Sequence, residues 1–173
     1  GKVNDFRIPN LELSGIGTTK IVASGRVTGL PDIQKTILDL DLKNFESSAK
    51  DLNDFLPSGT IPNNIQLPAK FTVNGKFNGS INNFKTDLKL KSTSGNATIK
   101  ALFDRSRKNA ERYDAIVNLD QFDLGRLLRN DSIGKISLDA KVKGVGLNPK
   151  TANATVSGNV KQAQFNGYNY TNL

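Results

Sequence analysis

Four residue types are missing from this chain of 173 residues: cysteine, histidine, methionine and tryptophan. Without cysteine there is no disulfide framework, no thiol nucleophile and no thiolate ligand for a metal. Without histidine there is no imidazole for acid–base chemistry and no Ser-His triad. The carboxylates Asp39, Asp41, Asp87 and Asp139 stand at outward strand positions among lysines, and neither Gly-x-Gly in the chain is followed by a helix, as a dinucleotide site requires. We therefore expect no catalytic residue, no metal site, no cofactor and no enzymatic activity.

Apolar residues are also scarce, at 36% of the chain with a mean hydropathy of −0.40. A strand of such a chain has enough apolar residues to bury only one of its two faces. No run of about 20 apolar residues is present, so no segment predicts a membrane span. Because the chain does not begin with methionine, we expect residues 1–173 to be one domain taken from a longer protein. Any membrane anchor is then expected outside this stretch.

The net charge of +8 favours acidic partners such as nucleic acid or an anionic membrane surface. The basic residues, however, are spread along outward strand positions and do not form one patch. Nucleic-acid binders usually place aromatic rings beside basic residues, whereas the nine phenylalanines here fall mostly on the apolar side of the strands. We expect no nucleic-acid partner and assign the charge to the solubility of a polar strand face.

The clearest pattern in the sequence is strict alternation over residues 66–79. Leu67, Ala69, Phe71 and Val73 point to one side, and polar residues between them point to the other. Successive side chains of a strand alternate between faces, so this segment predicts one long strand with one apolar and one wet face. Most of the remaining chain alternates in the same way between short Gly-, Pro- and Asn-containing turns.

The strand pattern also repeats. Residues 20–29 match residues 70–79 position by position, and residues 138–146 match the same unit more weakly. A repeated strand unit is typical of an architecture that grows by adding copies.

Two segments change from strand to helical spacing. Leu52, Phe55 and Leu56 stand three and four residues apart, after a serine cap and before Pro57. Residues 123–129 predict a second helix at the same place in the unit. The sequence therefore predicts a mainly β fold: a long, curved antiparallel sheet of about ten strands with two short helices. Alternation alone leaves open whether the apolar faces meet a second sheet or line an open groove.

A resemblance to a known family comes from residues 119–144. A Phe-x-Leu-x-x-Leu-Leu segment precedes a strand with the pattern Gly-x-x-x-Leu-x-x-x-x-x-Gly. The matching residues are Phe122, Leu124, Leu127, Leu128, Gly134, Leu138 and Gly144. This unit of strands and a short Leu-rich helix resembles the AsmA and TamB superfamily of bacterial envelope proteins.

The resemblance implies an open β-groove in the periplasm, anchored in the inner membrane by a segment outside this chain. It implies a role in carrying phospholipid acyl chains between the inner and outer membranes. Apolar burial stabilises by about 25 cal/mol per Å², so a floor of this kind can hold one acyl chain by several kcal/mol. The residues expected to line the groove are Phe71, Val73, Phe77, Leu88, Leu90, Ile99, Phe103, Val117, Leu138 and Val142.

A second hypothesis concerns protein partners. For the TamB branch, the resemblance implies help in assembling outer-membrane β-barrel proteins. The physical route is β-augmentation, in which a free sheet edge pairs with a strand of the client protein. Both hypotheses remain open at the level of the sequence.

Overall fold

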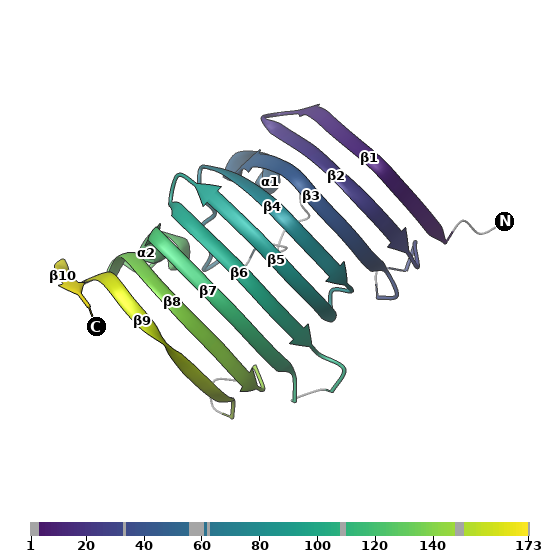
Figure 1. Ribbon diagram of the computed structural model, residues 1–173. Helices are drawn as coiled ribbons and strands as arrows, with labels where there is room; N and C mark the ends of the chain where they lie inside the picture. Colours follow the sequence, from purple (N-terminus) through teal and green to yellow (C-terminus); the bar gives the residue numbers. More distant parts are fainter. Residues whose placement is uncertain are drawn as a thin grey trace.

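The computed structural model describes residues 4–32, 34–55, 61, 63–107, 110–147 and 151–172. Within these residues it contains ten β-strands and two short α-helices (Figure 1). In chain order they are β1 (Asp5–Ile16), β2 (Thr19–Thr28), β3 (Ile37–Ser48), α1 (Ala49–Phe55), β4 (Lys70–Gly79), β5 (Asn83–Ser92), β6 (Gly95–Asp104), β7 (Arg112–Asp123), α2 (Leu124–Leu128), β8 (Ile133–Val145), β9 (Asn153–Phe165) and β10 (Tyr168–Thr171).

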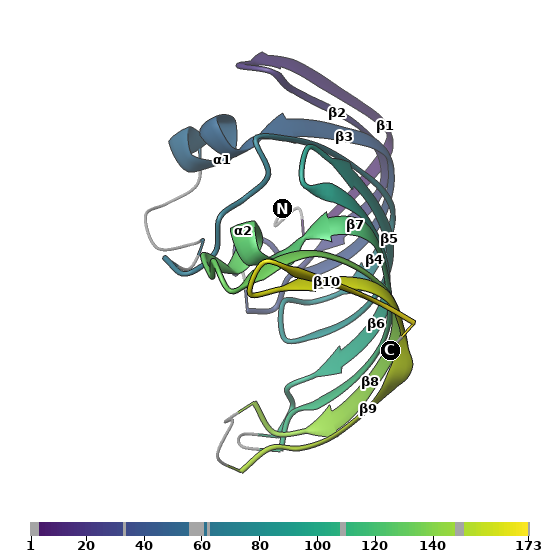
Figure 2. The same ribbon diagram turned by 90° about the vertical axis from the view of Figure 1, so that its left-hand side faces the viewer.

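All ten described strands belong to one sheet, whose order from β1 to β10 is the order of the chain. Each strand pairs antiparallel with its sequence neighbours, and β1 does not pair with β10, so the sheet is open. Seen end-on, the sheet bends into an arch with a concave and a convex side (Figure 2). The predicted fold, a curved antiparallel sheet of about ten strands with two short helices, is confirmed.

β-bulges interrupt several of the strand pairs. The register shifts between Leu42 and Phe45 where β3 faces β4, and between Leu119 and Phe122 where β7 faces β8. A bulge places an extra residue in one strand, which bends that strand and increases its twist. These two bulges lie near the ends of the strands that lead into α1 and α2. They therefore contribute to the curvature of the sheet on the side where the helices lie.

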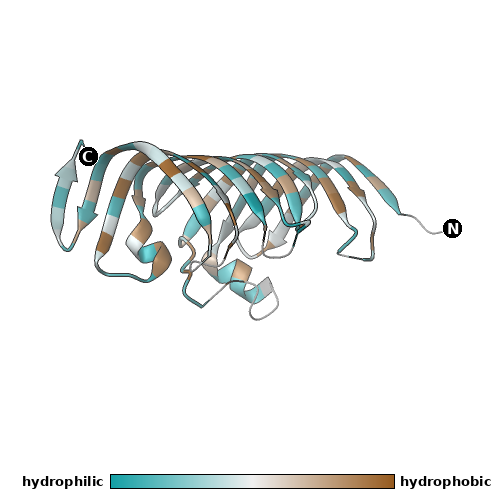
Figure 3. Cartoon of the chain, turned by 90° about the horizontal axis from the view of Figure 1, so that it is seen from below, coloured by the Kyte–Doolittle hydropathy of each residue, from teal (hydrophilic) through white to brown (hydrophobic). Residues whose placement is uncertain are grey.

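The two helices follow β3 and β7, which run in the same direction because strands of a meander alternate. Both helices therefore lie at one rim of the sheet, here called the helix rim, and on its concave side (Figure 3). Ser48 Oγ accepts the Asp51 N–H at 3.0 Å, and Asp123 Oδ1 accepts the Arg126 N–H at 2.9 Å, which caps each helix start. The predicted stop, Pro57, lies outside the described residues. In the part of the chain with described coordinates, neither helix has the length and apolar character of a membrane span.

The long strand predicted over 66–79 is shorter in the structure, because β4 begins at Lys70. The prediction is therefore wrong for the first four residues. The Gln66 N–H donates a hydrogen bond to the carbonyl oxygen of Leu127 in α2 at 2.8 Å. This bond holds the segment before β4 against α2 and not in the sheet. From residue 71 to residue 79 the predicted alternation holds.

A single carboxylate fastens α1 to the turn between β1 and β2. Asp51 Oδ2 accepts hydrogen bonds from the Thr18 backbone N–H at 2.9 Å and from Thr18 Oγ1 at 2.6 Å. The Thr18 hydroxyl, followed by the Thr18 N–H and the hydroxyls of Ser48 and Thr19, holds the pKa of Asp51 below its ordinary value of 3.8. These bonds favour the charged carboxylate, so ionised Asp51 holds α1 more firmly than protonated Asp51 does.

We expect Asp51→Asn to lower the melting temperature at neutral pH, because an amide oxygen is a weaker acceptor than a carboxylate. The folded-state pKa of Asp51 is depressed, so its contribution is fully present above the unfolded-state pKa. It is lost as the pH falls through the folded-state pKa. The difference in melting temperature between the wild type and Asp51→Asn should therefore close in acid, as followed by circular dichroism over a pH series.

The control is Asp54→Asn, which changes an exposed carboxylate on the same helix. Asp54 makes no hydrogen bond or ion pair with any described residue, so this variant should melt like the wild type at every pH. A difference for Asp51→Asn that stays constant from neutral to strongly acidic pH contradicts the assignment.

Candidate functional site

The ten residues predicted to line a groove lie on one face of the sheet. Leu88 stands opposite Ile99, and Ile99 stands opposite Val117. Residues opposite each other in an antiparallel pair share a face, and so do residues two apart along a strand. By this rule the same face carries Phe71, Val73, Phe77, Leu90, Phe103, Leu138 and Val142. We call these ten residues the groove floor.

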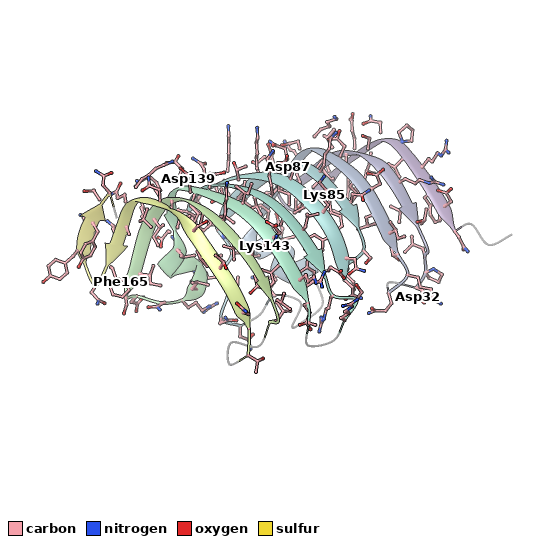
Figure 4. All side chains as sticks on the ribbon, turned by 60° about the horizontal axis from the view of Figure 1, so that its bottom comes forward. Asp32, Lys85, Asp87, Asp139, Lys143 and Phe165 are labelled. Carbon is pink, nitrogen blue, oxygen red and sulfur yellow. The ribbon has the colours of Figure 1, made fainter. Side chains whose placement is uncertain are left out.

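The groove floor lies on the concave side of the arch. Asp87 and Asp139, which alternate with Leu88 and Leu138 along β5 and β8, project from the convex side (Figure 4). The floor residues therefore point inward, toward the side on which α1 and α2 lie. The sequence alternation is thus realised as one face that crosses β4 to β8 and is apolar except at Thr86, whose hydroxyl donates a hydrogen bond to the carbonyl oxygen of Lys76.

No second sheet of the described residues covers the groove floor, and of its ten residues Phe71 alone is buried. Among the described residues no large side chain has less than 2% of its surface exposed, and the buried hydrophobic residues are Ala23, Phe71, Ala97 and Phe122. The chain exposes 11742 Å² of accessible surface, whereas a compact monomer of 18.8 kDa exposes about 8,300 Å². An excess of this size is expected for an open sheet with both faces accessible to solvent. The apolar face is therefore an open trough and not the interior of a sandwich.

Aromatic rings gather on the concave face at the rim opposite the helices. The ring centroids of Phe77 and Phe84 are 5.3 Å apart in a stacked pair, and those of Phe84 and Phe103 are 5.3 Å apart and tilted. Tyr113 continues this row on β7, and its ring lies where a side chain at position 144 would be. Gly144 thus leaves room for Tyr113 against β8. Aromatic side chains supply large apolar contact areas, so this rim is a broad apolar surface.

Charged residues occupy the convex face and pair with one another there. Lys100 Nζ lies 2.9 Å from Asp87 Oδ2, and Lys161 Nζ lies 2.6 Å from Asp139 Oδ2. Hydrogen bonds from Lys161 and then from Asn118 hold the pKa of Asp139 below its ordinary value. Such exposed ion pairs contribute little to stability, and these carboxylates face away from the groove floor.

Further residues of the site did not enter the predicted set. Phe84 and Leu119 share the concave face with the groove floor, and the same alternation would have found them. Phe45 shares this face too, but only because the bulge after Leu42 shifts the alternation of β3 by one residue. Arg126 and Arg129, at the helix rim, line an open cavity of about 670 Å³ between the two helices. No sequence pattern marked them, because the cavity forms only when the segment before β4 meets α2.

Comparison with protein-family models, curated proteins and solved structures gives no match for this chain. The resemblance to the AsmA and TamB superfamily therefore rests on the residues quoted for it. Across the residues with described coordinates, no group of three or more acidic side chains could hold a metal ion. The open concave face is therefore the candidate binding site of this chain.

Proposed function

We propose that this chain is a lipid-carrying groove of the AsmA and TamB type, which acts in the periplasm between the inner and outer membranes. Phospholipid acyl chains lie on the groove floor and move along it across successive strands. The observation that carries the proposal is the largely apolar concave face without a covering sheet among the described residues. Contiguous apolar surfaces larger than a few hundred Å² mark binding sites in soluble proteins.

The dimensions of the trough suit hydrocarbon chains. The ten strands of the described sheet, at a spacing of about 4.8 Å, make the sheet about 43 Å long, and the groove floor from β4 to β8 takes up about 19 Å of this length. The hydrocarbon of one bilayer leaflet is about 15 Å thick, so an acyl chain fits along the groove floor. At about 25 cal/mol per Å², the contact holds a chain without fixing its position, as transport along a surface requires.

The chemistry of the groove floor favours lipid over a peptide. A peptide brings backbone N–H and C=O groups, which lose free energy when they are buried without hydrogen-bond partners. The backbone of the sheet is already paired from strand to strand, and the floor side chains, such as Leu88, Ile99 and Val117, are apolar. An acyl chain has no polar group along its length and meets no such cost.

Native mass spectrometry of the gently purified chain tests the proposal. We expect peaks displaced from the protein mass by the mass of a phospholipid, with identities confirmed by extraction. Detergent washing should remove them, and addition of phospholipid vesicles should restore them. Protein that purifies without lipid and takes up none from vesicles contradicts the proposal.

The second candidate function is strand augmentation of outer-membrane β-barrel clients, and the open edges of the sheet favour it. β1 pairs only with β2, and β10, with four residues, covers only the last part of β9. Unpaired backbone groups at such edges can pair with another strand. Crosslinkers at Glu12 in β1 or Tyr170 in β10 should capture a client strand if this function operates. Lys20 lies in β2, inside the sheet, and serves as the negative control.

A further inference from the structure

The cavity at the helix rim is formed by three separate parts of the chain. α1 supplies Ala49 and Asn53, the segment before β4 supplies residues such as Ile65 and Leu67, and the region of α2 supplies two arginines. The parts are joined by the hydrogen bond from Gln66 in this segment to Leu127 in α2, at 2.8 Å. Helices and segment lie together on the concave side of the sheet (Figure 2).

The lining of this cavity of about 670 Å³ is half apolar and half polar. Asn53, Asn63 and Gln66 bring side-chain amides, which donate and accept hydrogen bonds. Arg126 and Arg129 bring the charge, and no acidic residue is among the described residues of the lining. The cavity is therefore a place for a group that is anionic on one side and apolar on the other.

Arg126 and Arg129 are both left without a carboxylate partner. Neither forms an ion pair within the described ranges, where the ion pairs belong to other residues. Both arginines also border an adjoining cavity of about 530 Å³ that contains Asp123 and Asp131. Asp123 Oδ1 is already occupied by the Arg126 backbone N–H that caps α2. Two exposed guanidinium groups, each with five N–H donors, thus line the cavity of about 670 Å³, and none of its described lining residues is acidic.

The apolar part of the cavity adjoins the start of β4. Leu67 and Ala69 line the cavity, and Phe71, two residues later along the chain, belongs to the groove floor at the start of β4. A molecule with its charged end at the arginines could therefore place its hydrocarbon on the floor. Phosphodiesters attached to acyl chains have this arrangement of charge and hydrocarbon.

We infer that Arg126 and Arg129 bind the phosphate of a glycerophospholipid whose acyl chains lie on the groove floor. The inference rests on the proposed function of the groove and adds the class of headgroup and its place. Arginine binds phosphate with paired, charge-assisted hydrogen bonds, so two such side chains select a phosphate-bearing lipid over a neutral one. The helix rim then becomes the side on which headgroups travel while the acyl chains remain on the floor.

The test uses the delipidated chain and three soluble probes: dihexanoyl phosphatidylglycerol, dihexanoylglycerol and inorganic phosphate. Binding is measured by isothermal titration calorimetry for the wild type and for Arg126→Gln combined with Arg129→Gln. The matched control is Arg105→Gln combined with Arg107→Gln, which removes the same charge from the loop between β6 and β7. That loop lies at the rim opposite the helices, and both of its arginines are exposed.

We expect the Arg126/Arg129 variant to bind the phospholipid at least tenfold more weakly, with its affinity for dihexanoylglycerol unchanged. The Arg105/Arg107 variant should stay within twofold of the wild type for both lipids. Equal phospholipid affinity in the wild type and the Arg126/Arg129 variant overturns the headgroup site while the groove proposal stands. Wild-type protein that binds neither lipid overturns the groove as well. Inorganic phosphate that binds as tightly as the phospholipid shows a free-anion site and also overturns the inference.

Discussion

We expect Val117→Asp to prevent phospholipid binding, with at least a tenfold fall in the amount of lipid bound per protein molecule. Val117 lies in the middle of the groove floor, opposite Ile99 on β6 and Ala140 on β8. A carboxylate here remains hydrated while the trough is empty, but an acyl chain lying over it would remove that water. Burying an unpaired charge costs far more than one apolar contact gains, so the chain is excluded.

The matched control is one residue away. Ile116 precedes Val117 in β7, points to the convex side and is 40% exposed. Ile116→Asp introduces the same charge between Lys100 and Lys141 on the neighbouring strands and should leave bound lipid unchanged. Lipid is quantified by extraction and mass spectrometry, and circular dichroism checks that both variants fold. Equal lipid loss from both variants, or none from Val117→Asp, argues against a concave binding face.

Gly75→Ala is expected to have the largest effect on stability. Gly75 lies within β4 at φ 132°, a conformation that residues with a side chain rarely adopt. A methyl group at this position would come 2.0 Å from the carbonyl oxygen of Asp87 on β5, where backbone atoms cannot give way cheaply. Backbone strain costs about 1–3 kcal/mol and overpacking adds about 1–3 kcal/mol, so the total is about 2–6 kcal/mol.

Gly15→Ala separates the two contributions. Gly15 also has a positive φ, of 91°, but a methyl group there would meet nothing within 4 Å. Both variants carry backbone strain, so urea denaturation should show Gly75→Ala to be less stable than Gly15→Ala by about 1–3 kcal/mol. Equal losses would mean that the close approach of β4 and β5 at Gly75 is not a real constraint.

The close approach of neighbouring backbones explains why the two repeated units share a glycine. Gly25 in residues 20–29 matches Gly75 in residues 70–79, and a methyl group on Gly25 would come 2.0 Å from the carbonyl oxygen of Asp39. The two units therefore share a backbone contact as well as a hydrophobic pattern. The repeat was visible from residue letters alone, whereas the reason for its glycine depends on the neighbouring strand.

Alternation was enough to predict which residues share a face, because the period of a strand is fixed by its backbone. All ten residues of the groove floor were assigned to their face in this way. Alternation could not decide whether that face was open, since a strand in a sandwich has the same pattern. The bulges that bend the sheet, such as the one between Leu119 and Phe122, depend on pairing between strands and leave no period in the sequence.

Tertiary contacts also explain what the sequence-based predictions missed. Leu67 and Ala69 continue the alternation of β4, so they were assigned to the strand, but the bond from Gln66 to Leu127 holds them at the helix rim. Local pattern was overridden there by a partner more than sixty positions away in the chain. Arg126 and Arg129 were missed for the same reason, because their cavity is made by residues from α1 and from the segment before β4.

The central claim is that hydrocarbon occupies the concave face, and photocrosslinking on β6 tests it most directly. A benzophenone amino acid is placed at Ile99, on the groove floor, or at the adjacent Lys100, on the convex side, and each protein is loaded with radiolabelled phospholipid. Illumination should attach labelled lipid to the protein substituted at Ile99 and not to the protein substituted at Lys100. Equal labelling at both positions, or labelling at Lys100 alone, would contradict the account.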